Sequence, residues 1–252
     1  MTESLIEIPE QEFPVFKMMG DSVINVYLAS EISSNINDEV HYLAGLIKKQ
    51  NWPGIKEIVP SYVSLSIHYD PFVVDYLSVA GFVKNILANN NEKTNSISKR
   101  IVVIPTLYDG DYGPDLDSVS SITGLSVEQI IKIHTNKEYK VYSIGFTPGF
   151  PYLGGLDNTL YCPRLDSPRI NVPLGSVAIA ELQTGIYPTE SPGGWRLIGR
   201  TPVTLFDATR PVPSLLRPGD LVKFKPMTDK KEFEHIKERS DKNDYQVEEI
   251  LV

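Results

Sequence analysis

The sequence contains a single cysteine, Cys162, among its 252 residues. One cysteine excludes an internal disulfide and a metal cluster built on cysteine, which suits a reducing compartment. A lone cysteine is usually a buried packing residue, so we do not assign it as a nucleophile. The four histidines, His41, His68, His134 and His235, are scattered along the chain. We therefore expect no metal site built on them.

Long apolar runs and excess basic charge are also lacking. No stretch approaches the ~20 apolar residues that a membrane-spanning helix needs. Residues 1–13 are acidic and lack the basic leader and apolar run of a signal peptide. The formal net charge of −8 argues against nucleic acid as a general partner, because phosphate binding needs a basic surface. We expect a cytoplasmic protein with no nucleic-acid partner and no membrane partner.

The motifs of several common enzymes are absent. The sequence has no Gly-x-x-x-x-Gly-Lys phosphate loop and no Gly-x-Gly-x-x-Gly run after a strand. It also has no His-Glu-x-x-His pair and no Gly-x-Ser-x-Gly elbow. If the protein uses a nucleotide, a classical loop on this chain does not hold it.

Glycine, proline and arginine are abundant in one segment, Tyr142–Asp220. It holds 10 of the 17 glycines and 11 of the 19 prolines, which predicts many turns and little long helix. It contains no lysine but six of the eight arginines: Arg164, Arg169, Arg196, Arg200, Arg210 and Arg217. Because guanidinium matches the geometry of carboxylate and phosphate, this bias predicts a site for a small anionic ligand.

The first half of the chain predicts the order strand, strand, helix, strand, strand, helix. The strands are expected at residues 13–19, 22–28, 55–59 and 62–68, and the first helix at about 36–49. Asp70 is expected to cap a second helix that begins at Pro71 and runs to Leu87. This order is typical of an α+β domain with its helices against one sheet face. The asparagine-rich segment 88–96 has the composition of a linker.

The second half predicts a strand at residues 100–107 and helices at 117–123 and 126–134. Ser126 is the expected cap of the second of these helices, and Val127, Ile130 and Ile131 its buried face. Short β-rich runs then recur between glycine and proline turns up to residue 226, which is typical of a barrel or a sandwich. Of the last 26 residues, 13 are charged. We interpret them as a solvated helix or frayed end, with an interaction tail as the alternative.

Three features of the second half are candidates for chemistry. His134 adjoins the arginine-rich segment and has a side chain suited to proton transfer, although a structural role is the alternative. The run Ser191–Gly194 is either an oxyanion cradle or a plain tight turn. Residues 183–191 are dense in polar groups and form a reasonable ligand rim. Each arginine has a salt-bridge alternative, but we expect at least one or two to face a ligand or a partner.

The order of motifs in the chain carries a further signal. The runs are Gly145–Gly155, Pro163-Arg164, Pro168-Arg169, Val172–Ala180, Gln183–Pro188, Glu190–Trp195, Leu197–Pro202, Leu205–Asp207 and Pro218–Asp220. Together with Gly20–Ser22, Pro60–Tyr62 and Tyr69–Pro71, they resemble the family of 5-oxoprolinase B subunits, also described as the KipI or allophanate hydrolase subunit 1 family. The resemblance covers about residues 13–226. It departs at Glu181-Leu182, where small residues are common, and in a longer charged tail.

This resemblance implies a fold and a set of partners. It implies a small α+β domain at residues 1–90, a mainly-β, cyclophilin-like barrel domain at 91–226 and a charged C-terminal tail at 227–252. It also implies a carboxyltransferase-like, cytoplasmic component of a hetero-oligomer, working with a 5-oxoprolinase C subunit of the KipA type and an A subunit of the LamB/YcsF type. Together these would cleave 5-oxo-L-proline to L-glutamate with ATP, which the complex uses and this chain alone is not expected to bind.

The resemblance and the residue chemistry together assign roles. We expect His134, Arg200 and Gln183 to be catalytic. Substrate-binding roles are expected for Arg164, Arg169, Tyr187, Glu190, Ser191, Gly193, Gly194 and Trp195. The alternative is a KipI-type inhibitor that docks on a sporulation histidine kinase, with Phe146, Phe150, Tyr152 and Trp195 as the contact surface. A prolyl isomerase is a weaker third possibility, because only an analogy of fold would support it.

Overall fold

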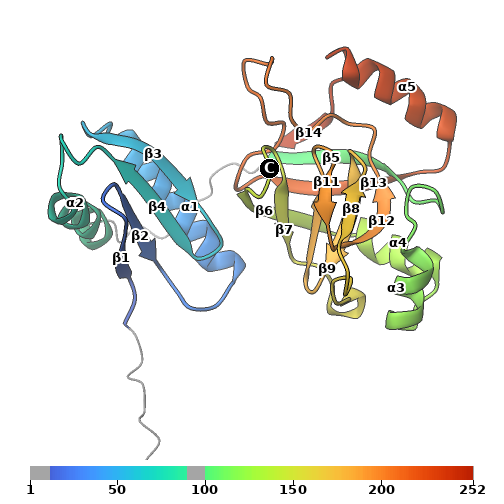
Figure 1. The fold of residues 1–252 in the computed structure, drawn as a ribbon, viewed down its shortest axis with the longest axis horizontal. Coiled ribbons are helices and arrows are strands. Elements are labelled where there is room, and N and C mark those ends of the chain that lie inside the picture. Colours follow the sequence, from blue (N-terminus) through green and yellow to red (C-terminus); the bar gives the residue numbers. More distant parts are fainter. Residues whose placement is uncertain (1–11, 90–99, 252) are drawn as a thin grey trace, which may run out of the picture. The chain divides into compact units, whose positions relative to one another are not determined.

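The computed structural model describes residues 12–89 and 100–251 (Figure 1). The chain divides into two compact units, Met1–Asn95 and Ser96–Val252, and each unit is described by itself. None of the helices in the described ranges combines the length and the apolar character needed to cross a bilayer.

The first unit is a four-stranded antiparallel sheet with two helices on one face. The strands have the order β1-β2-β4-β3. Their bounds are Val15–Met19 (β1), Val23–Tyr27 (β2), Ile55–Pro60 (β3) and Ser64–Tyr69 (β4). Alternate residues of β4, among them Leu65 and Ile67, are buried against the helices α1 (Ser34–Lys49) and α2 (Tyr76–Asn89). The predicted order of strands and helices is confirmed for this unit.

The predicted start of the second helix was wrong by about a turn and a half. Asp70 caps a local turn instead: its carboxylate accepts a hydrogen bond from the Phe72 N–H, and its carbonyl accepts from Val73 and Val74. The helix begins at Tyr76, where the Asp75 carboxylate accepts the Ser78 N–H at 2.7 Å. An aspartate followed by proline therefore formed a turn, and the next aspartate supplied the cap.

The second unit is built on a closed barrel. Seven strands follow the order β12-β9-β10-β7-β6-β13-β5, and the pair Arg200↔Leu107 between β12 and β5 closes the ring. The strand bounds are Arg100–Leu107 (β5), Glu138–Ile144 (β6), Pro151–Gly154 (β7), Ser176–Ala180 (β9), Gln183–Ile186 (β10), Arg196–Arg200 (β12) and Leu221–Met227 (β13). Large apolar side chains, including Ile104, Leu153, Ile179 and Phe224, fill the core. Of the two architectures left open by the sequence, the barrel is correct.

Helices surround this barrel. They are α3 (Leu116–Thr123), α4 (Val127–Thr135), the short 3-10 helix η1 (Asn158–Leu160) and α5 (Lys230–Asp241). Helix α4 begins at Val127, directly after the expected cap Ser126, whose side chain forms a capping box with Gln129. Its buried residues are Ile130 and His134, and Ile131 is only partly buried.

The charged C-terminal segment is folded onto the barrel. Helix α5 buries Phe233 and Ile236 in a cluster with Leu107 and Met227. Strand β14 (Glu248–Leu251) pairs antiparallel with β5. The charges thus lie on the outer side of an amphipathic helix and on an edge strand, and both elements belong to the same compact unit as the barrel.

A separate two-stranded ribbon positions the candidate site. Strands β8 (Arg169–Val172) and β11 (Ser191–Gly193) pair antiparallel, with Ser191 opposite Val172 and Gly193 opposite Arg169. The run Ser191–Gly194, which the sequence left open as a cradle or a plain turn, therefore begins with a strand.

Candidate functional site

The glycine- and proline-rich segment forms a cavity of about 270 Å³ in the barrel unit. Its lining residues are Phe146, Phe150, Tyr152, Arg164, Leu165, Pro168, Tyr187, Pro192, Gly193, Gly194 and Trp195. Its volume lies just below the roughly 300–1,000 Å³ typical of pockets for drug-sized ligands, so the cavity suits a smaller molecule.

Aromatic rings form the main wall of this cavity. Phe150 lies at the centre of this wall. The centroid of its ring is 4.9 Å from that of Tyr152, 5.2 Å from that of Tyr187 and 5.7 Å from that of Trp195. All three pairs meet edge to face, the arrangement that the ring quadrupoles favour. Phe150 and Tyr187 are each only 2% exposed. The wall is thus held by packing rather than assembled by a ligand.

Gly193 allows the ribbon to approach this wall closely. A Cβ atom at this position would lie 2.4 Å from the Tyr187 hydroxyl oxygen, which is shorter than any real contact. A side chain is therefore excluded, and the flanking backbone lies directly against the phenol. At Gly194 a Cβ atom would make only ordinary contacts, the nearest at 3.6 Å to Pro168.

Arg164 is the single charged side chain among the described residues that line the cavity. Its Nε lies 3.7 Å from Oε1 of Glu181, and both side chains are more than half exposed. Burial raises the pKa of Tyr187, and a hydrogen bond from the Trp195 backbone together with the charges of Arg164 and Arg169 acts in the opposite direction. Burial likewise raises the pKa of Tyr152, again opposed by Arg164. Both phenols therefore stay protonated at neutral pH.

The other predicted arginines are held by the protein. Arg169 donates from Nη2 to Asp115 at 2.6 Å, although its buried Nη1 has no hydrogen-bond partner within the described ranges. Arg196 donates to the Pro163 carbonyl and to Ser118, and Arg210 to Asn243 and the Thr204 carbonyl. For these residues the salt-bridge and structural alternative describes the observed contacts.

Arg200, a predicted catalytic residue, lies outside the cavity. Its Nε donates to the Leu174 carbonyl at 2.7 Å, and its backbone is part of the seam that closes the barrel. A cleft of about 10 Å³ beside it, lined by residues of α5 among others, is too small for a ligand. The geometry gives Arg200 a structural function.

His134, predicted as a proton carrier, is enclosed in the barrel interior with no exposed surface. Its Nδ1 lies 2.7 Å from the Tyr108 hydroxyl and its Nε2 lies 3.0 Å from the Thr184 hydroxyl. Burial lowers its pKa to about 3, so the ring is neutral at physiological pH. Both ring nitrogens are occupied by the protein, which is the structural alternative raised from the sequence.

Three further predicted residues do not line the cavity. Gln183 opens β10 and pairs with Ala180 and Gly154, and Glu190 is exposed. Ser191 precedes the cavity residue Pro192, and its buried hydroxyl has no hydrogen-bond partner in the described part of the chain. Of the predicted binding residues, the structure brings five together: Arg164, Tyr187, Gly193, Gly194 and Trp195.

Sequence reasoning did not place Phe146, Phe150, Tyr152, Leu165 or Pro168 in a ligand site. Phe146, Phe150 and Tyr152 were instead considered as a surface for a partner protein. The available signal was their alternation with glycine and proline in Gly145–Gly155, which indicates fixed backbone geometry rather than an adaptable surface.

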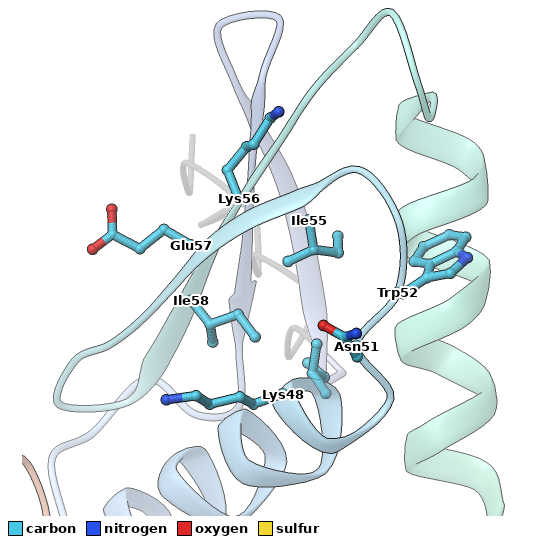
Figure 2. A pocket seen from close by; sticks show the side chains of 8 residues that line it. Lys48, Asn51, Trp52, Ile55, Lys56, Glu57 and Ile58 are labelled. Atoms are coloured by element: carbon cyan, nitrogen blue, oxygen red, sulfur yellow. The ribbon is translucent and has the colours of Figure 1, made fainter.

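A second pocket, of about 390 Å³, lies in the first unit between α1 and β3. Figure 2 shows Ile55 and Ile58 pointing from β3 toward the helix, whereas Lys56 and Glu57 point away. The ring of Trp52 turns toward α2 and packs on Phe82, 4.4 Å between centroids. The polar side chains that line this pocket are exposed and do not converge on one point, so the pocket is the weaker candidate site.

The described residues include neither a cluster of metal ligands nor an exposed thiol. Within the described residues, no group of three or more His, Cys, Asp or Glu side chains is arranged to hold a metal ion. Cys162 is buried, and burial raises the pKa of its thiol, with Arg196 acting weakly in the opposite direction. It has the properties of a packing residue, as the sequence predicted.

A closed barrel that carries a small, preformed aromatic cavity with one arginine is typical of a ligand-binding domain. Residues 14–216 match the family model "Carboxyltransferase domain, subdomain C and D", and the chain belongs to this family.

Curated relatives narrow the family further. The 5-oxoprolinase B subunit of Bacillus subtilis (strain 168) is 44% identical over 224 residues, covering 85% of this chain and 93% of the relative. The protein of the same name from Haemophilus influenzae (strain ATCC 51907 / DSM 11121 / KW20 / Rd) is 43% identical, covering 69% and 81%. The one from Escherichia coli O157:H7 is 52% identical over half of this chain and 58% of the relative. The resemblance drawn from the motif runs is confirmed.

Solved structures agree with this placement. The structure of TTHA0988 is 36% identical with a TM-score of 0.73 and covers 82% of this chain, which spans only 40% of that longer protein. The Pyrococcus horikoshii protein PH0987 is 46% identical with a TM-score of 0.52, covering 87% of this chain and all of that one. The Kluyveromyces lactis urea carboxylase, 20% identical, has a TM-score of 0.79 over 97% of this chain and 25% of its own length, which shows the fold alone.

Proposed function

We propose that the chain is the B subunit of an ATP-dependent 5-oxoprolinase, which cleaves 5-oxo-L-proline to L-glutamate together with its A and C subunits. The observation that carries this proposal is the 44% identity to a curated B subunit across 93% of that relative's length. The names of the relatives favour this enzyme over the kinase-inhibitor alternative. We also propose a cytoplasmic hetero-oligomer with partners of the KipA and LamB/YcsF types.

The chemistry explains why such an enzyme needs several components. Water attacks a lactam slowly because resonance stabilises the amide. Phosphorylation of the amide oxygen by ATP would create a better electrophile. The aromatic cavity does not fit ATP, because it is small and offers one cation for a triphosphate. We therefore propose that other components of the complex bind the nucleotide.

The cavity is the contribution that this chain makes to the reaction. We propose that Arg164, Tyr187 and Trp195, with the backbone at Gly193 and Gly194, bind and orient the substrate. The geometry supports no direct role for His134 or Arg200, because the first is enclosed in the core and the second lies outside the cavity. Their substitution would act through stability.

Reconstitution tests this proposal. The chain is expected to show no ATPase activity alone and to give 5-oxoproline-dependent ATP hydrolysis, with glutamate as product, when combined with its partner proteins. A matched complex that lacks only this chain is the control. If the full complex hydrolyses no ATP in response to 5-oxoproline, or is equally active without this chain, the proposed function is contradicted.

A further inference from the structure

The lining of the cavity indicates the class of ligand that it takes. Aromatic edges and faces surround the space, and Arg164 supplies its single charge. Such walls favour a compact ring, and a guanidinium favours a carboxylate on that ring. The phenols of Tyr152 and Tyr187 remain protonated and can donate or accept a hydrogen bond, as a neutral amide requires. The lining thus matches a small cyclic amide with one carboxylate.

Glu181 lies beside this site in an unusual backbone conformation. It opens the two-residue turn Glu181-Leu182 between β9 and β10, with φ at +54°. Its N–H donates to the Cys162 carbonyl at 2.6 Å, which fixes the turn two residues from Arg164. Glutamate gains nothing from a positive φ, where glycine or asparagine is favoured. The turn therefore does not require a glutamate, and the ion pair of this side chain is with Arg164.

The Arg164–Glu181 pair is loose enough to be replaced. Its 3.7 Å separation is longer than a charge-assisted hydrogen bond, and the two side chains are 58% and 56% exposed. Exposed pairs of this kind change an equilibrium constant by a factor of roughly 1.5 to 5. A ligand carboxylate inside the cavity would bind the same guanidinium in better geometry.

We infer that this chain by itself binds a small cyclic amide carboxylate in the aromatic cavity, and that Glu181 is the counter-ion that the ligand carboxylate displaces from Arg164. The inference rests on the proposed function for its choice of 5-oxo-L-proline as ligand. Binding precedes and does not require the partner proteins or ATP. Glu181 sets the affinity without touching the ring.

Intrinsic fluorescence of the isolated full chain tests the binding. The chain has two tryptophans, so Trp52→Phe leaves Trp195, which lines the cavity, as the single reporter. Titration with 5-oxo-L-proline is expected to give a saturable change, confirmed by calorimetry. Pyrrolidin-2-one, which has the ring but no carboxylate, is expected to bind at least 10-fold more weakly. Arg164→Ala is expected to reduce the affinity for 5-oxo-L-proline by a similar factor, and Arg217→Ala, at an exposed arginine outside the cavity, to leave it unchanged.

Separate variants test the role of Glu181 as the counter-ion of Arg164. Glu181→Gln keeps the size of the side chain and is expected to tighten 5-oxo-L-proline binding two- to fivefold, with no effect on pyrrolidin-2-one. Asp166→Asn removes the same charge from an exposed residue two positions after Arg164 and is expected to have a smaller effect. Equal or weaker binding by Glu181→Gln would overturn the counter-ion assignment.

Absence of saturable binding by the isolated chain, in fluorescence and in calorimetry, would overturn the whole inference. An active reconstituted complex combined with a non-binding isolated chain would refute this inference and leave the proposed function standing. A binding chain in a complex without 5-oxoproline-dependent ATP hydrolysis would refute the proposed function instead.

Discussion

The barrel unit contains two aromatic clusters with polar groups. In one cluster the protein binds the polar groups fully, and in the other the charged group stays partly exposed beside a cavity. In the barrel interior, His134 stacks near Phe224 and Tyr139, with ring centroids 4.5 Å and 5.2 Å away. Protein hydroxyls occupy both of its nitrogens. The Tyr139 hydroxyl donates to the His134 carbonyl at 2.8 Å. The polar side-chain groups of His134 and Tyr139 thus all have protein partners.

The cavity cluster around Phe150 leaves its charged group partly exposed. Arg164 makes a loose contact with Glu181, and the Tyr187 phenol lies against a backbone that lacks a side chain at Gly193. A titratable residue among aromatic side chains is thus structural when the protein supplies hydrogen-bond partners for all of its polar atoms. It is a binding candidate when its polar atoms adjoin a cavity.

The largest predicted effect comes from removing a buried carboxylate that joins two parts of the barrel unit. Asp115 accepts hydrogen bonds from the Leu197 N–H and from Arg169, both at 2.6 Å, and is 7% exposed. Asp115→Ala leaves a backbone donor and a guanidinium unpaired. We expect it to lower the free energy of unfolding by about 2–4 kcal/mol. Urea denaturation measures this, with Asp117→Ala on the exposed side of α3 as control. A loss below about 1 kcal/mol would show that the network is not structural.

The next effect distinguishes two neighbouring glycines. Gly193→Ala would place a Cβ atom 2.4 Å from the Tyr187 hydroxyl oxygen, whereas Gly194→Ala meets nothing closer than 3.6 Å. We expect Gly193→Ala to cost about 1–3 kcal/mol of stability, as overpacking does. We also expect it to change Trp195 fluorescence. Gly194→Ala is expected to stay within about 0.5 kcal/mol of the parent. Equal melting temperatures for both variants would contradict the close approach.

The third effect tests the interior cluster through pH. Burial lowers the pKa of His134 from 6.5 to about 3. Between these two pH values the His134 ring is protonated in the unfolded chain and neutral in the folded chain. The stability due to the neutral ring is complete above pH 6.5 and is lost as the pH falls toward 3. The slope is at most about 1.4 kcal/mol per pH unit. His134→Gln should lower stability overall and flatten this slope, as measured by denaturation between pH 7 and 4. Parallel slopes for parent and variant would exclude His134 as the source.

The sequence predicted the elements well where alternation and capping agree. The strands of the first unit and the capping box at Ser126 follow from local pattern and chemistry. Strands β7 and β11 are hard to predict from the sequence because they are short and contain proline, which normally argues against a strand. The start of α2 was misplaced because Asp70 and Asp75 are both good caps, and only packing decides between them.

The candidate site was only partly predictable for a different reason. Composition indicated an arginine-rich site, but it does not show which guanidinium groups hydrogen-bond to carbonyls or carboxylates of the protein itself. Arg200 lies on the closing strand and reaches Leu174, whereas Arg164 lies at a cavity. Phe150 and Tyr152 were missed as ligand-site residues because strand pairings that no local pattern fixes bring them beside Tyr187 and Trp195.

The smallest predicted effect is the sharpest test of the comparison, because it contrasts an arginine at the cavity with an arginine bound by the protein. Arg164→Ala removes an exposed side chain whose ion pair is loose, so the free energy of unfolding is expected to change by no more than about 0.5 kcal/mol. Arg200→Ala removes a charged donor from the Leu174 carbonyl at the barrel seam and is expected to cost about 1–2 kcal/mol. Paired denaturation curves measure both. A large loss for Arg164→Ala would place this arginine with the satisfied groups of the fold, and the distinction between a structural and a binding guanidinium would then not hold at this site.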